Sequence, residues 1–171
     1  MSRFKLSLSV QYPDDRLKNE LPRWRIRRWV QSALQMPATI TIRFVDAEEG
    51  LALNHAYRGK DYATNVLTFP YEDDIDFLPP ELQENAQENA QTDGNTTSAS
   101  ADIVLCTDVL LREAKEQQKT LLEHAAHLVI HGTLHAQGYD HIEDAEAEEM
   151  EALETEILGQ LGFDDPYQVK D

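Results

Sequence analysis

The sequence contains a single cysteine, Cys106, among its 171 residues, so the chain cannot form an internal disulfide. It also lacks any apolar run that approaches the roughly 18 residues needed to span a bilayer. Its N-terminus alternates polar and apolar side chains and does not have the apolar core of a signal peptide. These absences predict a cytoplasmic protein without a membrane partner. We interpret Cys106 as a small buried core residue.

Cationic residues are scarce as well, since 15 Lys and Arg stand against 32 Asp and Glu, giving a formal net charge of −17. Residues 1–70 carry 11 Lys and Arg with 7 Asp and Glu, whereas residues 71–171 carry 4 and 25. This acidity argues against indiscriminate binding to polyanions, although it permits a local basic groove. Such a groove would draw on the cations Arg23, Arg25, Arg27, Arg28, Arg58 and Lys60. For the cluster at 23–28, nucleic-acid contact and a solvated helix face are both open interpretations.

The hydrophobic periodicity predicts an α+β domain. Period-2 alternation or short apolar runs predict strands at residues 4–10, 40–44, 66–71 and 101–106. Helical spacing and capping signals predict helices that begin near Pro22, Asp46, Thr107, Thr120 and Asp144. We therefore expect one domain over residues 1–171, with a small mixed four-stranded sheet packed against helices. The glutamates from Glu146 to Glu156 in the last helix are interpreted as a solvated face.

Residues 72–100 differ from the rest of the chain. They include Pro79-Pro80, a tandem Gln-Glu-Asn-Ala repeat at residues 83–90 and a stretch rich in Ser, Thr, Asn and Gly. This composition cannot bury enough apolar surface to support a packed core. The segment is predicted to be a flexible surface insertion.

The segment from His131 to His141, HGTLHAQGYDH, is the most informative part of the sequence. His131 and His135 fall one turn apart on the same face of a predicted helix. Gly138 can adopt the left-handed conformation that ends a helix, after which His141 can return to the same point. Three imidazoles with a fourth direction open are typical of a catalytic divalent metal site, most often zinc. Nickel or cobalt would also suit three histidines.

The same spacing occurs in metzincin proteases, whose motif is H-E-x-x-H-x-x-G-x-x-H. Here Gly132 occupies the position of the glutamate that serves as general base in peptide hydrolysis. Because glycine has no side chain, the site is predicted to perform a different reaction. Three neutral imidazoles leave the ion its full charge, which favours an anionic transition state such as that of a phosphodiester.

Other polar residues are assigned by position. His127 is predicted to lie behind the ligands or in the core, and His124 and His55 to be structural or exposed. Asp140 could orient an imidazole or assist proton transfer. Arg58, at a helix-to-loop junction before Gly59, is the best candidate for a catalytic guanidinium that binds phosphate oxygens, with a surface salt bridge as the alternative.

The whole chain except residues 72–100 resembles the YbeY family of bacterial metal-dependent endoribonucleases. The family string H-G-x-L-H-x-x-G-Y-D-H is matched without exception from His131 to His141. Further matches lie at residues 57–61, 64–70, 102–105, 126–128, 148–150 and 157–158. The chain departs from the family at Thr68, where serine is common, at Ala101, where glycine is usual, and in the length of the insertion.

The resemblance implies zinc held by His131, His135 and His141, with Arg58 in the active cleft. It also implies single-stranded RNA as substrate and a role in small-subunit ribosomal RNA 3′-end maturation and ribosome quality control. The implied partners are the small ribosomal subunit and its assembly factors, and we expect neither DNA nor membrane. Two alternatives are kept. The first is a non-catalytic ribosome-assembly factor that is stabilised by the metal. The second is a metallopeptidase, although Gly132 counts against it.

Overall fold

The computed structural model describes residues 4–59, 64–70, 98–138 and 144–163, apart from a few side chains at the edges of these ranges. Four strands form one sheet: β1 (Leu6–Gln11), β2 (Ala38–Val45), β3 (Val66–Pro70) and β4 (Ala99–Cys106). Five helices accompany them in the described ranges: α1 (Arg23–Ala33), α2 (Ala47–Arg58), α4 (Thr107–Glu116), α5 (Leu121–Ala136) and α6 (Asp144–Gln160). The predicted α+β class is confirmed.

The sheet is mixed, with strand order β1-β2-β4-β3. β1, β2 and β4 are parallel, and their register places Val10 beside Ile42 and Ile42 beside Ile103. β3 runs antiparallel to β4, with Thr68 beside Ile103. A parallel connection needs a long crossover, and α1 provides it between β1 and β2.

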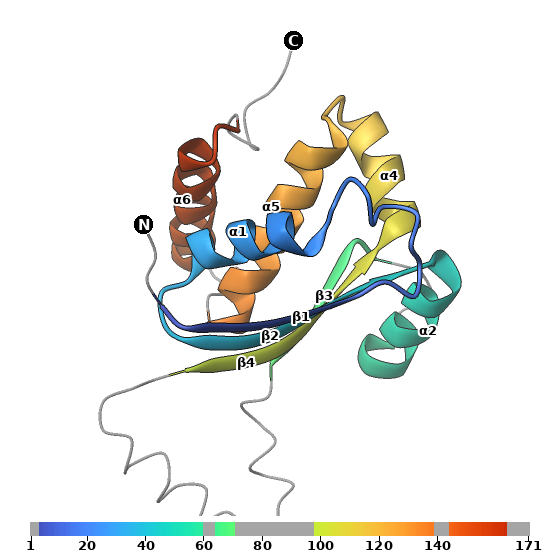
Figure 1. Cartoon of the computed structure of the whole chain (residues 1–171), viewed down its shortest axis with the longest axis horizontal. Coiled ribbons are helices and arrows are strands. Elements are labelled where there is room, and N and C mark those ends of the chain that lie inside the picture. Colours follow the sequence, from blue (N-terminus) through green and yellow to red (C-terminus); the bar gives the residue numbers. More distant parts are fainter. Residues whose placement is uncertain (1–3, 60–63, 71–97, 139–143, 164–171) are drawn as a thin grey trace, which may run out of the picture.

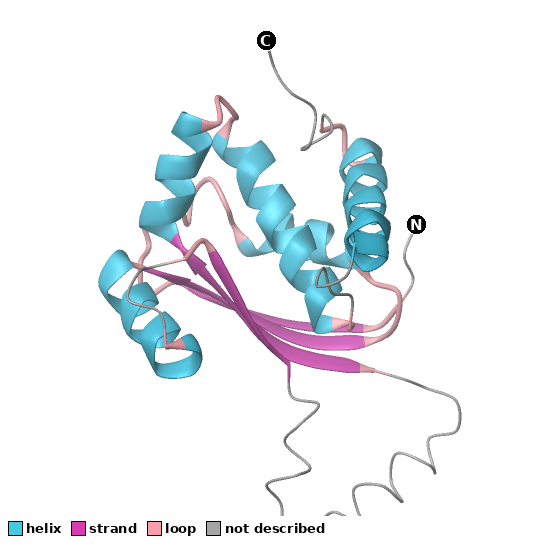
Figure 2. Cartoon of the chain, turned by 180° about the vertical axis from the view of Figure 1, so that it is seen from behind, coloured by secondary structure: helices cyan, strands magenta, loops and turns pink. Residues whose placement is uncertain are grey.

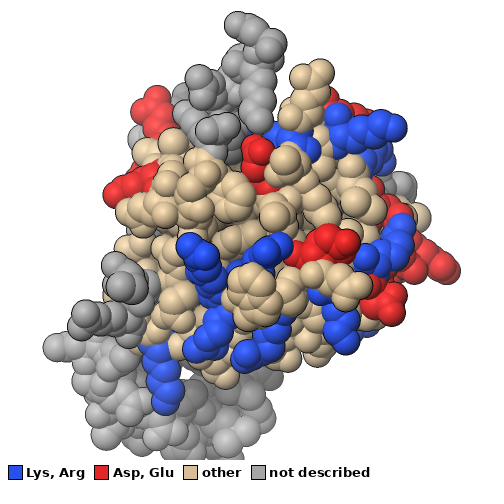
Figure 3. Space-filling view, turned by 45° about the horizontal axis from the view of Figure 1, so that its top comes forward, with Lys and Arg blue, Asp and Glu red and all other residues tan. Residues whose placement is uncertain are grey.

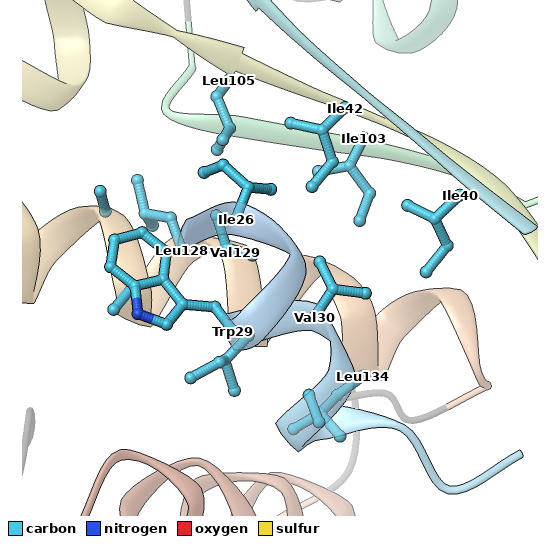
Figure 4. Packing of buried hydrophobic residues seen from close by; sticks show 14 of the residues in the cluster. Ile26, Trp29, Val30, Ile40, Ile42, Ile103, Leu105, Leu128, Val129 and Leu134 are labelled. Atoms are coloured by element: carbon cyan, nitrogen blue, oxygen red, sulfur yellow. The ribbon is translucent and has the colours of Figure 1, made fainter. Parts of the chain in front are cut away.

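The larger core lies between the sheet and the helices α1, α5 and α6, which cover one face (Figures 1 and 2). Because successive strand residues point to opposite faces, Ile40, Ile42 and Phe44 all point towards these helices. Figure 4 shows side chains of α1 and α5 converging on Ile40, Ile42 and Ile103 of the sheet. Burying this apolar surface is the main driving force for the arrangement.

A smaller cluster occupies the other face of the sheet and includes Val45, Val104 and Cys106, with Leu53 of α2 packed against it. Cys106 is buried there, as predicted, and burial raises the pKa of its thiol. Among the described residues, no helix is both long and apolar enough to cross a bilayer.

Local signals fix the helix ends. The backbone N–H of Glu49 donates to the Asp46 side chain at the start of α2, and that of Glu123 donates to Thr120 Oγ1 at the start of α5. Gly59 ends α2 with φ +68°, and Gly138 follows α5 with φ +100°. Few residues other than glycine adopt this region of backbone conformation. The predicted caps and stops of α2 and α5 are therefore confirmed.

Two sequence predictions need correction. Thr107 does not cap α4 but forms its first residue, where its side chain is fully buried and Oγ1 has no hydrogen-bond partner in the described structure. The predicted insertion at 72–100 extends too far, because Ala99 and Ser100 belong to β4 and pair with Ala38 and Thr39 of β2. Small polar residues give a weak strand signal, which long-range pairing here overrides. Residues 71–97 lie outside the described ranges.

Candidate functional site

Three histidines follow one face of α5, because His127, His131 and His135 are each separated by four residues. The rings of His127 and His131 have centroids 6.2 Å apart, and those of His131 and His135 are 4.5 Å apart. The side chain of His131 is 24% exposed and that of His127 is 15% exposed. This face is therefore neither fully buried nor fully open to solvent.

His131 and His135 bring two nitrogens together. Their Nε2 atoms are 3.0 Å apart. Two ligands of one zinc ion, each about 2.0–2.1 Å from it, are separated by a similar distance. The predicted pairing of these two residues on one helix face is thus present in the structure, with the donor chemistry that zinc prefers.

Glu154 of α6 joins this group. Its side chain is fully buried, Oε2 lies 3.0 Å from His127 Nε2, and Oε1 forms a hydrogen bond with His131 Nδ1. The interpretation of all these glutamates as a solvated face is therefore wrong for Glu154. Position 154 lies four residues after buried Met150 and three before buried Ile157. That spacing puts it on the inner stripe of α6, a signal available in the sequence.

The donor atoms also form a second potential group. One donor atom each from His127, His131 and Glu154 lie within 4.8 Å of one another, close enough to hold a metal ion. This group shares His131 with the pair formed by His131 and His135, but it takes its other donors from His127 and Glu154. Both fit a divalent transition metal by donor type.

Gly132 is pressed against the sheet. A Cβ built at this position would lie 3.0 Å from Ile103 Cγ2 and 3.3 Å from Thr68 Oγ1. A side chain here would point into β3 and β4 rather than towards the histidine face. The glutamate that peptidases carry after the first histidine has no room at this position in this fold, which argues against the metallopeptidase alternative.

Comparison with known proteins places this chain in a family. The family model described as endoribonuclease YbeY matches residues 10–162. Proteins named endoribonuclease YbeY from Janthinobacterium sp. (strain Marseille) and Herminiimonas arsenicoxydans are each 59% identical to the chain over 167 residues. These alignments cover 98% of this chain and 97% and 98% of the two relatives. The chain belongs to the YbeY family.

A solved structure agrees on the fold. The solution structure of TM1509 from Thermotoga maritima matches with a TM-score of 0.50 at 22% identity, covering 94% of this chain and 99% of that one. At this identity the match concerns the fold alone. It supports the arrangement of sheet and helices on which the histidine face of this YbeY family member lies.

Three residues predicted for the site are not placed by the structure. His141 and its neighbour Asp140 lie outside the described residues. Arg58 is the last residue of α2, which packs against β2, β4 and α4, but its side chain is outside the described part. The roles of His141 and Arg58 in this YbeY family member therefore stay predictions.

The remaining histidines have separate environments. His55 is exposed on α2, which is one of the two alternatives predicted for it. His124 is buried near the start of α5, where its Nε2 lies 3.0 Å from Glu113 Oε1 of α4. Burial lowers the pKa of His124, and the hydrogen bond to Glu113 opposes this shift only in part. His124 is therefore a structural residue, as predicted.

The basic cluster of the N-terminal half lies on α1. Arg23 donates to the carbonyl oxygen of Leu8 and Arg25 to that of Glu20. Trp24 is 62% exposed, with the Arg25 guanidinium 4.9 Å from its ring centroid. Lys and Arg side chains gather on the face that Figure 3 shows. Within the described residues, none of the four arginines of α1 forms an ion pair.

Proposed function

We propose that this chain is a metal-dependent endoribonuclease that cleaves single-stranded RNA. The observation that carries the proposal is identity of 59% over nearly the whole chain to proteins named endoribonuclease YbeY. Within the cell, the proposed role is small-subunit ribosomal RNA 3′-end maturation and ribosome quality control in the cytoplasm. The proposed partners are the small ribosomal subunit and its assembly factors.

His131, His135 and His141 are proposed to hold the metal ion, with zinc as the first choice. The convergence of the His131 and His135 Nε2 atoms supports this set, because those atoms already approach each other to 3.0 Å. A divalent ion bound there supplies a Lewis acid for phosphate oxygens and lowers the pKa of water at the site.

Arg58 is proposed to bind the non-bridging phosphate oxygens. A guanidinium can hold two such oxygens at once, and its charge stabilises the negative charge that gathers on the phosphate in the transition state. The nucleophile is either water or the neighbouring ribose 2′-hydroxyl. Attack by the 2′-hydroxyl leaves a cyclic phosphate, so end-group analysis of the cleaved RNA identifies the route.

The test combines elemental analysis of the purified protein with cleavage of a single-stranded RNA, with and without a chelator. We expect about one equivalent of a divalent transition metal, cleavage that the chelator abolishes and its recovery when metal is restored. Arg58→Ala should reduce the cleavage rate about 100-fold with little change in thermal stability. Arg112→Ala, at a position with a 61% exposed side chain on α4, is the matched control and should cleave normally.

Other outcomes would contradict the proposal. Unimpaired cleavage by Arg58→Ala would remove the role of Arg58. A wild-type protein that never cuts RNA, combined with loss of folding in His131→Ala, would favour the metal-stabilised assembly factor.

A further inference from the structure

The buried carboxylate of Glu154 lies between two imidazoles. Its two oxygens take separate partners, His131 Nδ1 and His127 Nε2, and the side chain has no exposed surface. A buried carboxylate is costly unless hydrogen bonds compensate for its lost hydration. The inward-facing stripe of α6 is otherwise apolar, so a leucine would suit position 154. Instead, α6 places a carboxylate against His127 and His131 of α5.

The contact with Glu154 determines which nitrogen of His131 carries the hydrogen. An ionised carboxylate only accepts hydrogen bonds, so Nδ1 of His131 is the donor. In a neutral imidazole the other nitrogen, Nε2, then carries the lone pair. Nε2 is the atom that lies 3.0 Å from the corresponding atom of His135. The carboxylate therefore selects the form of His131 that can bind a metal through Nε2.

We propose that Glu154 is a positioning residue for the metal centre. It fixes the ring orientation and the tautomer of His131, and the negative charge makes the ring a stronger electron donor. His127 satisfies the second oxygen and so holds the carboxylate in place. The inference rests on the proposed function, because the ion concerned is the one assigned above to His131 and His135.

The competing arrangement makes His127 and Glu154 direct ligands. It would leave His135 without a role in binding. It would also put the ion against a side chain with 0% exposure, where substrate has little access. If Glu154 instead only accepts a hydrogen bond from His131 Nδ1, the ion can bind at His131 Nε2 and His135 Nε2, on the partly exposed histidine face. We therefore assign Glu154 to hydrogen bonding.

The test measures zinc affinity by competition with a chromophoric chelator. Glu154→Gln keeps the shape of the side chain but removes its charge, and we expect zinc affinity to fall about 10- to 100-fold. Glu151→Gln, on the exposed face of the same helix, is the matched control and should bind like the wild type. The absorption spectrum of the cobalt-loaded protein should change in Glu154→Gln but not in Glu151→Gln. Loss of a purely structural contact would leave this spectrum unchanged.

Two results would overturn the inference. The first is wild-type zinc affinity in Glu154→Gln. The second is loss of zinc binding in Glu154→Gln and His127→Ala with wild-type affinity in His135→Ala, because then Glu154 is itself a ligand. If Glu154→Gln does not fold, Glu154→Asp is used instead. This shorter side chain keeps the charge but moves the carboxylate away from His127 and His131, so this variant should also bind zinc more weakly. Undiminished affinity in that variant would also refute the proposed role.

Wild-type measurements separate this inference from the proposed function. If the wild type binds zinc and cleaves RNA while Glu154→Gln does both equally well, only the positioning role is lost. If the wild type binds no transition metal, both the metal dependence and the positioning role are overturned.

Discussion

Gly132 lies on the side of α5 that packs against β3 and β4, next to the first proposed ligand. Its missing side chain permits the helix to approach Ile103 closely, with 3.0 Å between a built Cβ and Ile103 Cγ2. Ile103 is fully buried in the central part of the sheet, so it has little freedom to move. The glycine therefore has a packing role in addition to excluding a peptidase base.

Replacing this glycine should destabilise the protein. We expect Gly132→Val to lower the free energy of unfolding by about 1–3 kcal/mol, because its methyl groups must enter space that β4 already fills. Gly159→Ala is the control, since a Cβ at Gly159 of α6 meets no atom within 4 Å. It should raise stability by roughly 0.5 kcal/mol through helix propensity. Urea unfolding measures the free energies of unfolding of both variants. If Gly132→Val were as stable as the wild type, the close contact between Gly132 and Ile103 would be wrong.

At the scale of elements, polar side chains that are buried or half-buried connect the helices to one another and to the segment before β3. Glu113 Oε1 of α4 accepts hydrogen bonds from Asn65 Nδ2, at 2.9 Å, and from His124 Nε2 of α5, at 3.0 Å. Nδ1 of His124 has no partner in the described structure. A neutral ring with its hydrogen on Nε2 satisfies Glu113, whereas protonation would add a buried donor at Nδ1 without an acceptor. This agrees with the lowered pKa of His124.

The lowered pKa predicts a loss of stability in mild acid. Above pH 6.5, the ordinary value for histidine, His124 is neutral in both the folded and the unfolded chain. As the pH falls below 6.5 the unfolded chain takes up a proton that the folded chain refuses, so the free energy of unfolding decreases. The loss is up to about 1.4 kcal/mol per pH unit until the folded pKa is reached.

Unfolding of wild type and His124→Gln, measured between pH 7.5 and 5 in the presence of chelator, isolates this effect. The difference between the two free energies of unfolding should shrink as the pH falls, because only the wild type loses the contribution of His124. A difference that stays constant with pH would contradict the assignment of a buried neutral ring.

At the scale of the whole molecule, the charge distribution indicates a surface for the proposed RNA substrate. The chain carries a net charge of −17, yet its four neighbouring arginines on α1 form no ion pair within the described structure. Exposed Trp24 adds an aromatic surface beside them. Arginines next to an exposed aromatic ring are typical of single-strand binding surfaces. The arginines are on α1, and the C-terminal end of α1 contacts that of α5, the helix that carries the three histidines, because Gln137 donates to the carbonyl oxygen of Ala33.

The hypothesis of nucleic-acid contact at residues 23–28 predicts salt-dependent binding. Arg27→Glu combined with Arg28→Glu should weaken binding to single-stranded RNA, and the slope of log affinity against log salt should fall by about 0.7 for each lost phosphate contact. Arg112→Glu on α4 is the control for a change of net charge away from this surface. Fluorescence anisotropy over a salt series measures both. An unchanged slope in the double variant would favour the solvated helix face instead.

The sequence alone determined the features that depend on neighbours along the chain. Alternation at Ile40, Ile42 and Phe44 predicted a strand, Asp46 and Thr120 predicted helix starts, and the four-residue spacing put His131 and His135 on one face. These features follow from the fixed periods of helix and strand. The α+β class was accessible for the same reason, whereas the family resemblance depended on the identities of the residues from His131 to His141.

Only the tertiary structure decided which distant residues meet. The strand order β1-β2-β4-β3 joins segments far apart in sequence, as does the contact of Gly132 with Ile103. So do the hydrogen bonds that Glu154 accepts from His127 and His131. Glu154 is the clearest case. Its spacing from Met150 and Ile157 indicates the inner stripe of α6, but only the packing of α6 on α5 decides that it contacts His127 and His131. Local periodicity identifies a face of a helix, whereas long-range packing decides what that face contacts.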